Sequence, residues 1–395
     1  MKRIVTSSPD YIVSRNIVAY PPEGYTYVRR RDCFDLLSAL AGRGLGIRSK
    51  RLKYTHRDFG LYRADLHHLF GTISLDSQPW VVSHSGILPD WGNASPRAIR
   101  RGIERLAGSH CKKIIALSES TVRSEESLVR RFAPDLMGEI MKKTVIIHPP
   151  QRVFCESSAN VLDPQLQATF IGTNFFRKGG AELLLAMDRL CKMGANIRLH
   201  LVTQIRQEPG SRVPEALFDE CQRILRTRSD KIISYGKLPN TTVLAILRRS
   251  HLALLPTYVD RYGYTVLEAQ ASATPVITTN IRALKEINNL GCGWVIQIPT
   301  DEIGNCIYSA ARAPDDVRET IVSGIVSAME EAFNDRQLLA EKGQGSLARI
   351  KAFHCPEVHV YRLRKIYDEA LGLSPEPLRT SQTSAGPERA LKLND

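Results

Sequence analysis

Two glycine-containing loops in this chain carry residue types that suit the binding of a phosphate ester. The first loop follows the apolar run Leu166–Ile171 and contains Gly172 and Lys178, with two more glycines before a helical pattern that starts at Ala181. Backbone N–H groups at a glycine turn and at a helix N-terminus favour an anion, and the lysine adds a positive charge. The spacing is not that of a P-loop. A solvent-facing turn with a basic residue is the alternative interpretation.

The second loop combines a carboxylate, a glycine and the start of a helix. It carries Asp260 and Gly263, and Tyr264 and Thr265 then open a helix that bears Glu268. Gly263 lets the backbone approach a ligand, and the first N–H groups of the helix suit a phosphate. A carboxylate such as Glu268 accepts hydrogen bonds from sugar hydroxyls, as in dinucleotide folds. Each acid alone is explained more simply as a loop acid or a first-turn helix acid, but the combination favours a ligand site.

Alternating strand and helix patterns must position these loops. Such alternation predicts an α/β fold whose parallel sheet has right-handed crossovers, and ligands of such sheets collect beyond the carboxyl ends of the strands. The predicted strands of this part cover residues 166–171, 197–203, 231–235, 251–255 and 275–278, and helices are expected at 181–187, 214–225, 241–248 and 267–273.

The first 150 residues show the same alternation less clearly. Strands are expected at residues 2–6, 25–29, 79–83, 113–117 and 144–147, and helices at 35–41 and 96–107. A double proline at 149–150 is typical of a domain boundary. We therefore expect an N-terminal domain over 1–150, a linker over 151–163, a C-terminal domain over 164–355, a final helix over 356–372 and a disordered tail over 373–395.

The stretch from Phe170 to Val295 resembles the nucleotide-sugar-binding domain of the retaining GT-B glycosyltransferases of family 4. The family's motif, an acid, seven residues and Glu-Ala, stands here as Asp260 followed by Glu268 and Ala269, and a Pro-Val-Ile run comes next. Lys178 and the glycines around it match the family's phosphate-binding loop. The resemblance implies two Rossmann-like domains that face each other across a cleft. The first of them would bind the acceptor and the second the nucleotide sugar.

The implied reaction moves a sugar from a nucleotide diphosphate donor, UDP or GDP, to an acceptor hydroxyl with retention of the anomeric configuration. By the resemblance, Asp260 contacts the donor sugar, Lys178 holds the diphosphate and Glu268 holds the ribose. His84, which follows a predicted strand, would face the donor sugar from the N-terminal domain, although a hydrogen-bonded loop histidine is an equal alternative. The remaining donor-binding residues would be Gly172, Thr173, Gly263, Tyr264 and Thr265.

Two departures from the family pattern keep a second function open. Asp260 stands where most members carry Glu, and Thr173 stands where many carry an Arg beside the phosphate. A non-catalytic GT-B-like subunit that binds a partner or a nucleotide is therefore the alternative. The family usually needs no metal, and we expect no metal and no other cofactor.

The positive charge of the chain is concentrated at its start. Of the net charge of +13, residues 1–150 contribute +10, from 24 basic and 14 acidic residues. Such asymmetry indicates an anionic partner or simply a solubilising surplus. By the resemblance, the partner would be an anionic membrane surface with a lipid-linked acceptor, and an anionic saccharide or other hydroxyl acceptor is the alternative. No basic module with interleaved aromatic residues is present, so no nucleic acid is expected. The basic residues in question are Arg43, Arg48, Lys50, Arg51, Lys53, Arg57, Arg97, Arg100, Arg101 and Arg105.

The cysteines and the apolar runs bear on the compartment. The eight cysteines form no CxxC pair, which argues against a cysteine-built zinc site and favours a reducing compartment. The first residues lack the apolar region of a signal peptide, and no run approaches 18 apolar residues. We expect a cytoplasmic protein, peripheral on the inner face of the membrane if its acceptor is lipid-linked, with a role in bacterial cell-surface polysaccharide or glycolipid synthesis.

Overall fold

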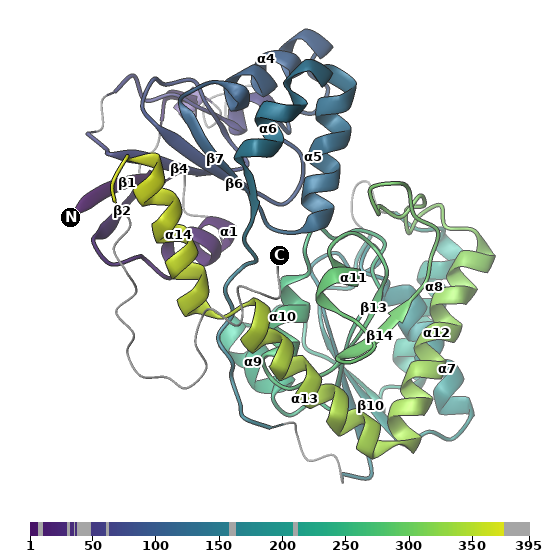
Figure 1. Cartoon of the computed structure of the whole chain (residues 1–395). Helices are drawn as coiled ribbons and strands as arrows, with labels where there is room; N and C mark the ends of the chain where they lie inside the picture. The colour runs from purple at the N-terminus through teal and green to yellow at the C-terminus, as the bar shows by residue number, and fades with distance from the viewer. Residues whose placement is uncertain are drawn as a thin grey trace. The chain divides into compact units, whose positions relative to one another are not determined.

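The structure is a computed structural model that describes residues 1–6, 11–29, 32–34, 36–37, 49–60, 63–157, 163–207 and 212–374. The chain divides into two compact units (Figure 1). The N-terminal unit comprises residues 1–150 and 353–395, and the C-terminal unit comprises residues 151–352. Each unit contains a six-stranded sheet whose strands all run parallel, which confirms the predicted α/β class.

The sheet of the C-terminal unit has the strand order β11-β10-β9-β12-β13-β14. The chain turns back on this order between β9 and β12, so their carboxyl ends form the topological switch point at which open α/β sheets bind ligands. The strands are β9 (Leu166–Ile171), β10 (Ile197–Val202), β11 (Ile232–Ser234), β12 (Leu252–Leu255), β13 (Val276–Thr279) and β14 (Gly293–Ile296).

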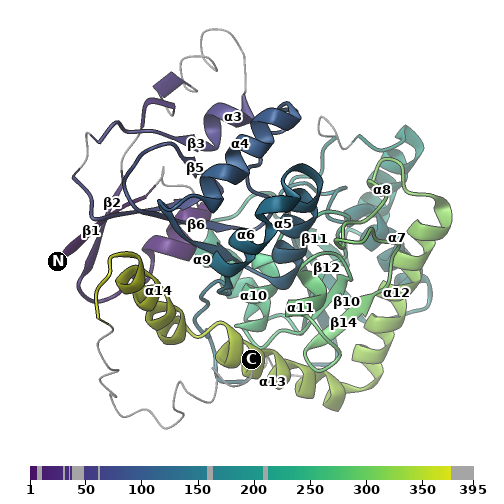
Figure 2. The same ribbon diagram turned by 45° about the horizontal axis from the view of Figure 1, so that its top comes forward.

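Helices cover both faces of this sheet. In Figure 2, α7, α8 and α12 lie on one side of it, and α9, α10 and α11 lie on the other. This two-sided cover explains why the inner strand β12 is a continuous apolar run, whereas β10, one strand from the edge, alternates apolar and polar residues. The helices are α7 (Gly180–Lys192), α8 (Glu215–Thr227), α9 (Asn240–Leu247), α10 (Tyr264–Gln270), α11 (Leu284–Ile287), α12 (Asp315–Asn334) and α13 (Arg336–Phe353).

The sheet of the N-terminal unit has a different order, β2-β1-β4-β6-β7-β8, and a two-stranded ladder of β3 and β5 lies apart from it. The strands are β1 (Lys2–Thr6), β2 (Tyr25–Arg29), β3 (Thr55–His56), β4 (Leu66–Phe70), β5 (Ile73–Ser74), β6 (Trp80–His84), β7 (Cys111–Ala116) and β8 (Thr144–Ile146). The helices are α1 (Tyr11–Val13), α3 (Lys50–Lys53), α4 (Pro96–Ala107), α5 (Glu119–Phe132), α6 (Met137–Lys143) and α14 (Pro356–Ala370), with a π-helix η1 (Ser14–Val18) and a 3₁₀ turn η2 (Pro134–Leu136).

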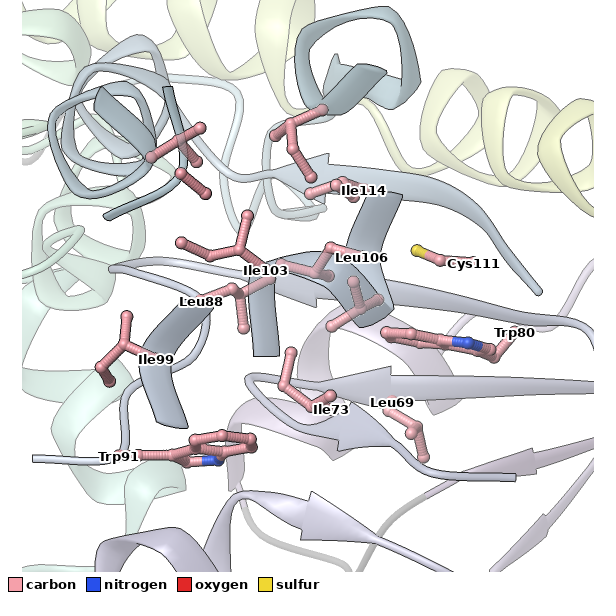
Figure 3. Packing of buried hydrophobic residues seen from close by; sticks show 14 residues of the cluster. Leu69, Ile73, Trp80, Leu88, Trp91, Ile99, Ile103, Leu106, Cys111 and Ile114 are labelled. Atoms are coloured by element: carbon pink, nitrogen blue, oxygen red, sulfur yellow. The ribbon is translucent and has the colours of Figure 1, made fainter. Parts of the chain in front are cut away.

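Two apolar layers cover the faces of the N-terminal sheet. On one face, Leu69, Trp80 and Val82 pack against residues of α4 such as Ile103 (Figure 3). On the other face, the C-terminal helix α14 packs its apolar residues on the strands. This second layer contains Ile4, Tyr25, Leu66, Val81, Ile115, Ile147, Leu363, Ile366 and Tyr367.

Most predicted elements agree with the structure, and several were missed. The strands at 2–6, 25–29 and 166–171 and the helix at 96–107 are confirmed residue for residue. β14, α5, α12 and α13 were not predicted. β4, which was not predicted either, places His67 and His68 inside a buried strand. Most of the helix expected at 35–41 and all but the start of the tail fall outside the described residues.

Candidate active site

The loops that follow β9 and β12 meet at the switch point of the C-terminal unit. Lys178, in the first loop, places its Nζ 2.5 Å from Oδ2 of Asp260 in the second loop. The same Nζ donates a hydrogen bond of 3.1 Å to the carbonyl oxygen of Val259. The two side chains remain 14% and 18% exposed, so an incoming ligand can reach both. The structure therefore brings together the lysine and the carboxylate that the sequence analysis selected in separate loops.

Two glycines after Lys178 allow the first loop to lie against the second. Gly179 has φ +78°, and a Cβ built on it would lie 2.0 Å from the carbonyl oxygen of Pro256. A Cβ on Gly180 would lie 2.2 Å from the ring of Phe175. Neither position accepts a side chain without a shift of its surroundings. The close approach of these glycines fixes where the backbone of Lys178 lies relative to the second loop.

The second loop is held by its own hydrogen bonds and by a glycine. Oδ1 of Asp260 accepts a hydrogen bond from the N–H of Tyr262 at 3.1 Å, which leaves Oδ2 for Lys178. Gly263 has φ +95°, and a Cβ there would lie 2.5 Å from Leu284 of α11. A left-handed glycine thus turns the chain from the carboxylate into α10.

A buried network of charged and polar side chains stabilises the two loops. The hydroxyl of Tyr258, in the second loop, donates a hydrogen bond of 2.9 Å to Oε1 of Glu182 in α7, and Arg318 of α12 forms an ion pair with the same oxygen. The Glu182 side chain is fully buried and that of Arg318 is 12% exposed. Burial raises the pKa of Glu182, and Arg318 opposes this shift. The network ties the loop after β12 to two helices.

No sequence pattern predicted this network. One signal was available for Glu182, because it is the one charged residue in an otherwise apolar run of α7, from Ala181 to Met187. No signal pointed to Arg318, which lies far along the chain and reaches Glu182 only through the packing of α12 on α7.

The remaining residues predicted to bind the donor differ in how far their side chains are exposed. Gly172 lies beside Lys178, since a Cβ on it would be 3.2 Å from Cγ of that lysine. Thr173 is exposed next to it. Tyr264 and Thr265 are half-buried in the first turn of α10, and Glu268 is buried one turn further along the helix.

His84 belongs to the N-terminal unit. It is the last residue of β6, its side chain is buried, and its carbonyl oxygen accepts a hydrogen bond from the N–H of Leu117. The loop after it is held by Glu125 of α5, whose Oε2 accepts a hydrogen bond of 2.6 Å from the N–H of Leu88. Burial raises the pKa of Glu125 to about 8. His84 thus lies at the carboxyl end of a strand, as the sequence analysis expected.

This arrangement in the C-terminal unit suits one kind of ligand. A lysine next to a glycine turn can bind phosphate oxygens, and a carboxylate at hydrogen-bond distance from it can bind hydroxyl groups. The two charges neutralise each other in the ligand-free site. A ligand that is anionic at one end and rich in hydroxyls at the other can replace the ion pair by contacts to both residues.

Sequence comparison places this site in a known family domain. Residues 157–307 match the family described as Glycosyl transferases group 1. The chain is 28% identical over 135 residues to glycogen synthase of Mycobacterium tuberculosis, covering 34% of this chain and 31% of the relative. It is 27% identical over 124 residues to D-inositol 3-phosphate glycosyltransferase of Segniliparus rotundus, covering 31% and 27%. These matches span less than a third of the length of the curated relatives.

Structural comparison covers nearly the whole chain. Sucrose-phosphate synthase from Thermosynechococcus elongatus superposes with a TM-score of 0.57 at 15% identity, over 95% of this chain and 100% of the other. A glycosyltransferase from Rickettsia africae gives 0.57 at 13% identity, over 94% and 99%. Anabaena HepE in complex with UDP gives 0.57 at 10% identity, over 92% and 99%. The chain thus has the GT-B fold, and residues 157–307 of its C-terminal unit match the family described as Glycosyl transferases group 1.

Proposed function

We propose that this protein is a retaining glycosyltransferase of family 4 that transfers a sugar from a nucleotide diphosphate sugar, UDP- or GDP-linked, to an acceptor hydroxyl. The observation that carries the proposal is the contact between Lys178 and Asp260 at the switch point, inside the region that matches the family. The proposal is supported by relatives and a structural neighbour that are named as glycogen synthase or as glycosyltransferases.

The ion pair suggests how the donor is received. The diphosphate replaces Asp260 as the partner of Lys178, and the carboxylate is thereby released toward hydroxyls of the donor sugar. When the glycosidic bond to phosphate breaks, negative charge grows on the departing phosphate. A lysine already held in position stabilises this charge without reorganisation, which is the main source of catalysis in such sites.

The other donor contacts follow from the resemblance. Glu268 would bind the ribose hydroxyls, and the N–H groups of Tyr264 and Thr265, with Gly263 before them, would bind the phosphates. Gly172 and Thr173 would line the other side of the diphosphate. His84 of the N-terminal unit would face the donor sugar. No metal or other cofactor takes part in these contacts.

The N-terminal unit offers a cavity for the acceptor. It has a volume of about 580 Å³ and an amphipathic lining, with arginines beside apolar side chains. Arg51 lies over the ring of Trp91 at 5.3 Å, and Arg101 is exposed. Such a lining suits an anionic group attached to an apolar portion, as in a lipid-linked acceptor. The lining residues are Phe34, Ser49, Arg51, Leu52, Thr55, Leu75, Trp91, Arg101, Glu104 and Arg105.

This acceptor class implies work at the cytoplasmic surface of an anionic membrane, in the synthesis of cell-surface polysaccharide or glycolipid. Among the helices in the described part of the chain, none is both long and apolar enough to cross a bilayer. Exposed basic residues of α3 and α4, among them Lys53 and Arg97, would contribute about 1 kcal/mol each at an anionic surface. Flotation with anionic and with neutral vesicles tests this, and equal binding to both would contradict it.

Nucleotide binding is the first test of the donor site. Thermal unfolding is followed with UDP, GDP and ADP for the wild type, for Lys178→Ala and for the control Lys285→Ala, an exposed lysine of α11. A nucleotide at 100 times its Kd should stabilise the wild type and the control by about 2.7 kcal/mol. Lys178→Ala should lose most of this stabilisation. An equal shift in Lys178→Ala would contradict the site.

Turnover separates the enzyme from a non-catalytic subunit. Asp260→Asn should retain nucleotide binding but lower the rate of sugar-nucleotide turnover about 100-fold or more, because a preorganised polar contact to the reacting centre is lost. Wild-type protein that binds a nucleotide yet turns over none of its sugar derivatives, with vesicle-borne and soluble acceptors present, would favour the subunit.

A further inference from the structure

Four ligand-type side chains meet inside the N-terminal unit. They are His56, Asp58, His67 and Asp76, and one imidazole nitrogen or carboxylate oxygen from each lies within 4.8 Å of the other three. His56 Nε2 is 3.7 Å from Asp76 Oδ2, and His67 Nε2 is 3.6 Å from Asp58 Oδ2. All four residues are more than nine-tenths buried. The cluster is thus a closed group of two imidazoles and two carboxylates.

The fold brings these residues together from three strands. His56 ends β3, and Asp58 follows in the next loop. His67 lies inside β4, and Asp76 comes two residues after β5, which pairs with β3. Because neighbouring residues of a strand point to opposite faces, His67 turns toward the cluster while His68 turns toward α14 and bonds the hydroxyl of Tyr367.

Buried polar atoms of the cluster lack hydrogen-bond partners. Within the described residues, His56 Nε2, Asp58 Oδ2 and His67 Nε2 have none. The separations of 3.6 and 3.7 Å are too long for hydrogen bonds. Leaving such atoms buried and unpaired destabilises the folded protein, and more so when they are charged. Atoms with this cost that converge on one point indicate a missing ligand at that point.

In His56 and Asp58 the second polar atom has a partner that fixes the orientation of the first, whereas neither ring nitrogen of His67 has a hydrogen-bond partner among the described residues. His56 Nδ1 is 2.5 Å from Oδ2 of Asp32, which leaves Nε2 directed into the cluster. Asp58 Oδ1 accepts a hydrogen bond of 2.8 Å from the N–H of Gly60, which leaves Oδ2 for the cluster. A carboxylate that holds the far nitrogen of a histidine is the usual support of a metal-binding imidazole.

The geometry fits a small divalent ion. Zinc binds histidine nitrogen and carboxylate oxygen at about 2.0–2.2 Å, so neighbouring ligand atoms of a tetrahedral site lie about 3.3–3.6 Å apart. The separations of 3.6 and 3.7 Å are close to this range, and all the ligand atoms lie within 4.8 Å of one another, so the cluster must contract by up to about 1 Å around the ion. Two imidazoles favour zinc over magnesium or calcium, which prefer oxygen ligands throughout.

The charge of the cluster also favours a cation. Asp32, Asp58 and Asp76 bring three carboxylates into the interior. The nearby guanidinium of Arg105 donates its hydrogen bonds to main-chain carbonyl oxygens, those of Ser74 and Asp76, rather than to these carboxylates. Buried carboxylates are retained when they are paired or coordinate a metal.

We propose that His56, Asp58, His67 and Asp76 bind one zinc ion in a closed, structural site, and that Asp32 positions His56 as a ligand. All four ligands come from the protein and are buried, so no coordination position is left for a substrate. The ion joins β3, β4 and the loop after β5. This metal lies outside the transfer reaction, in which no metal is expected.

Metal analysis of the whole chain tests the proposal. Protein dialysed against a chelator and then against zinc should hold about one zinc per chain and unfold at a higher temperature than the chelated protein, and magnesium should not replace it. Cobalt should give the intense visible bands of a four-coordinate ion. Wild-type protein that takes up no stoichiometric zinc, or whose Tm does not respond to zinc, would overturn the proposal.

Variants separate the site from surface binding. Asp58→Asn with His67→Gln should lose the zinc and the zinc-dependent rise in Tm, whereas the control His110→Gln, an exposed histidine, should keep both. Asp32→Asn should keep the site but weaken zinc affinity about 10–100-fold. Zinc content unchanged in the double variant would show adventitious binding and overturn the site. If the double variant does not fold, the zinc affinity of Asp32→Asn decides, and an affinity equal to that of the wild type would overturn the proposal.

Discussion

Two groups of charged residues in this protein are built in opposite ways. In the C-terminal unit, Lys178 and Asp260 balance each other and keep some exposure to solvent. In the N-terminal unit, His56 and its three neighbours in the cluster are buried, and four of their polar atoms, including both ring nitrogens of His67, have no hydrogen-bond partner among the described residues. The first group is complete without a ligand, and its internal contact can be exchanged for contacts to a ligand. The second is complete only when a cation fills it.

Under the two proposals, exposure separates a donor site, at which ligands exchange, from a zinc site, at which the ion stays bound. An accessible ion pair costs little when it is broken, because water and ligand both compensate it. A buried group of charges that no protein partner neutralises binds an ion tightly, because release of the ion would leave those charges unpaired in the protein interior. If this distinction holds, the loops of the first site and the interior of the N-terminal unit should respond to substitution in these two different ways.

The largest effect is expected where the two donor-site loops touch. Gly179→Ala adds a Cβ 2.0 Å from the Pro256 carbonyl oxygen at φ +78°, and should lower the free energy of unfolding by about 3 kcal/mol or more and abolish nucleotide binding. The control Gly194→Ala has φ +80° but nothing within 4 Å, and should cost only about 1–2 kcal/mol. Urea denaturation measures both, and equal losses would contradict a tight contact between the loops.

A second large effect is expected beneath these loops. Arg318→Met leaves Glu182 buried without its ion-pair partner and should cost about 3–5 kcal/mol, measured by urea denaturation. The double variant Glu182→Gln/Arg318→Met should recover part of this loss. The exposed Arg312→Met is the control and should change little. If the double variant is no more stable than Arg318→Met alone, the two residues are not coupled.

A pH-dependent effect is expected in the N-terminal unit. Burial raises the pKa of Glu125 to about 8, so between its usual pKa and 8 the folded protein holds a proton that the unfolded chain releases. The stability that this bound proton contributes is fully present below the pKa that Glu125 has in the unfolded chain, and it is lost as the pH rises to 8. Between pH 5 and pH 8, the free energy of unfolding of Glu125→Gln should therefore rise relative to that of the wild type by more than about 1 kcal/mol. The control Glu126→Gln should follow the wild type. Parallel pH profiles for the wild type and Glu125→Gln would refute the shift.

The smallest effect is expected at an exposed pair. Arg100 and Asp135 form two hydrogen bonds of 2.8 Å on the surface of the N-terminal unit. Exposed ion pairs contribute little, because solvent screens them and ordering the side chains costs entropy. Asp135→Asn should leave the Tm unchanged in a thermal scan. A clear drop would mean that exposure does not separate weak from strong charged contacts in this protein.

Sequence patterns predicted the elements that are continuous in the chain and missed contacts that depend on packing. Apolar runs ended by Gly or Pro identified strands such as β9 and β12, and their order placed Lys178 and Asp260 at one edge of a sheet. The partnership of Glu182 with Arg318 depends on how α12 packs on α7, which no local pattern encodes. The ligands around His67 come together through the pairing of short strands that the sequence did not reveal.

The position of α14 in the chain determines the order in which the N-terminal unit is completed during synthesis. Its strands are all made by residue 146, but the helix that covers Leu66 and Val81 begins at Pro356, after the whole C-terminal unit. Domains usually fold as they leave the ribosome. The nascent N-terminal sheet therefore has one apolar face uncovered until the C-terminal unit has been translated, and a fragment that stops at residue 150 should bind chaperones and aggregate.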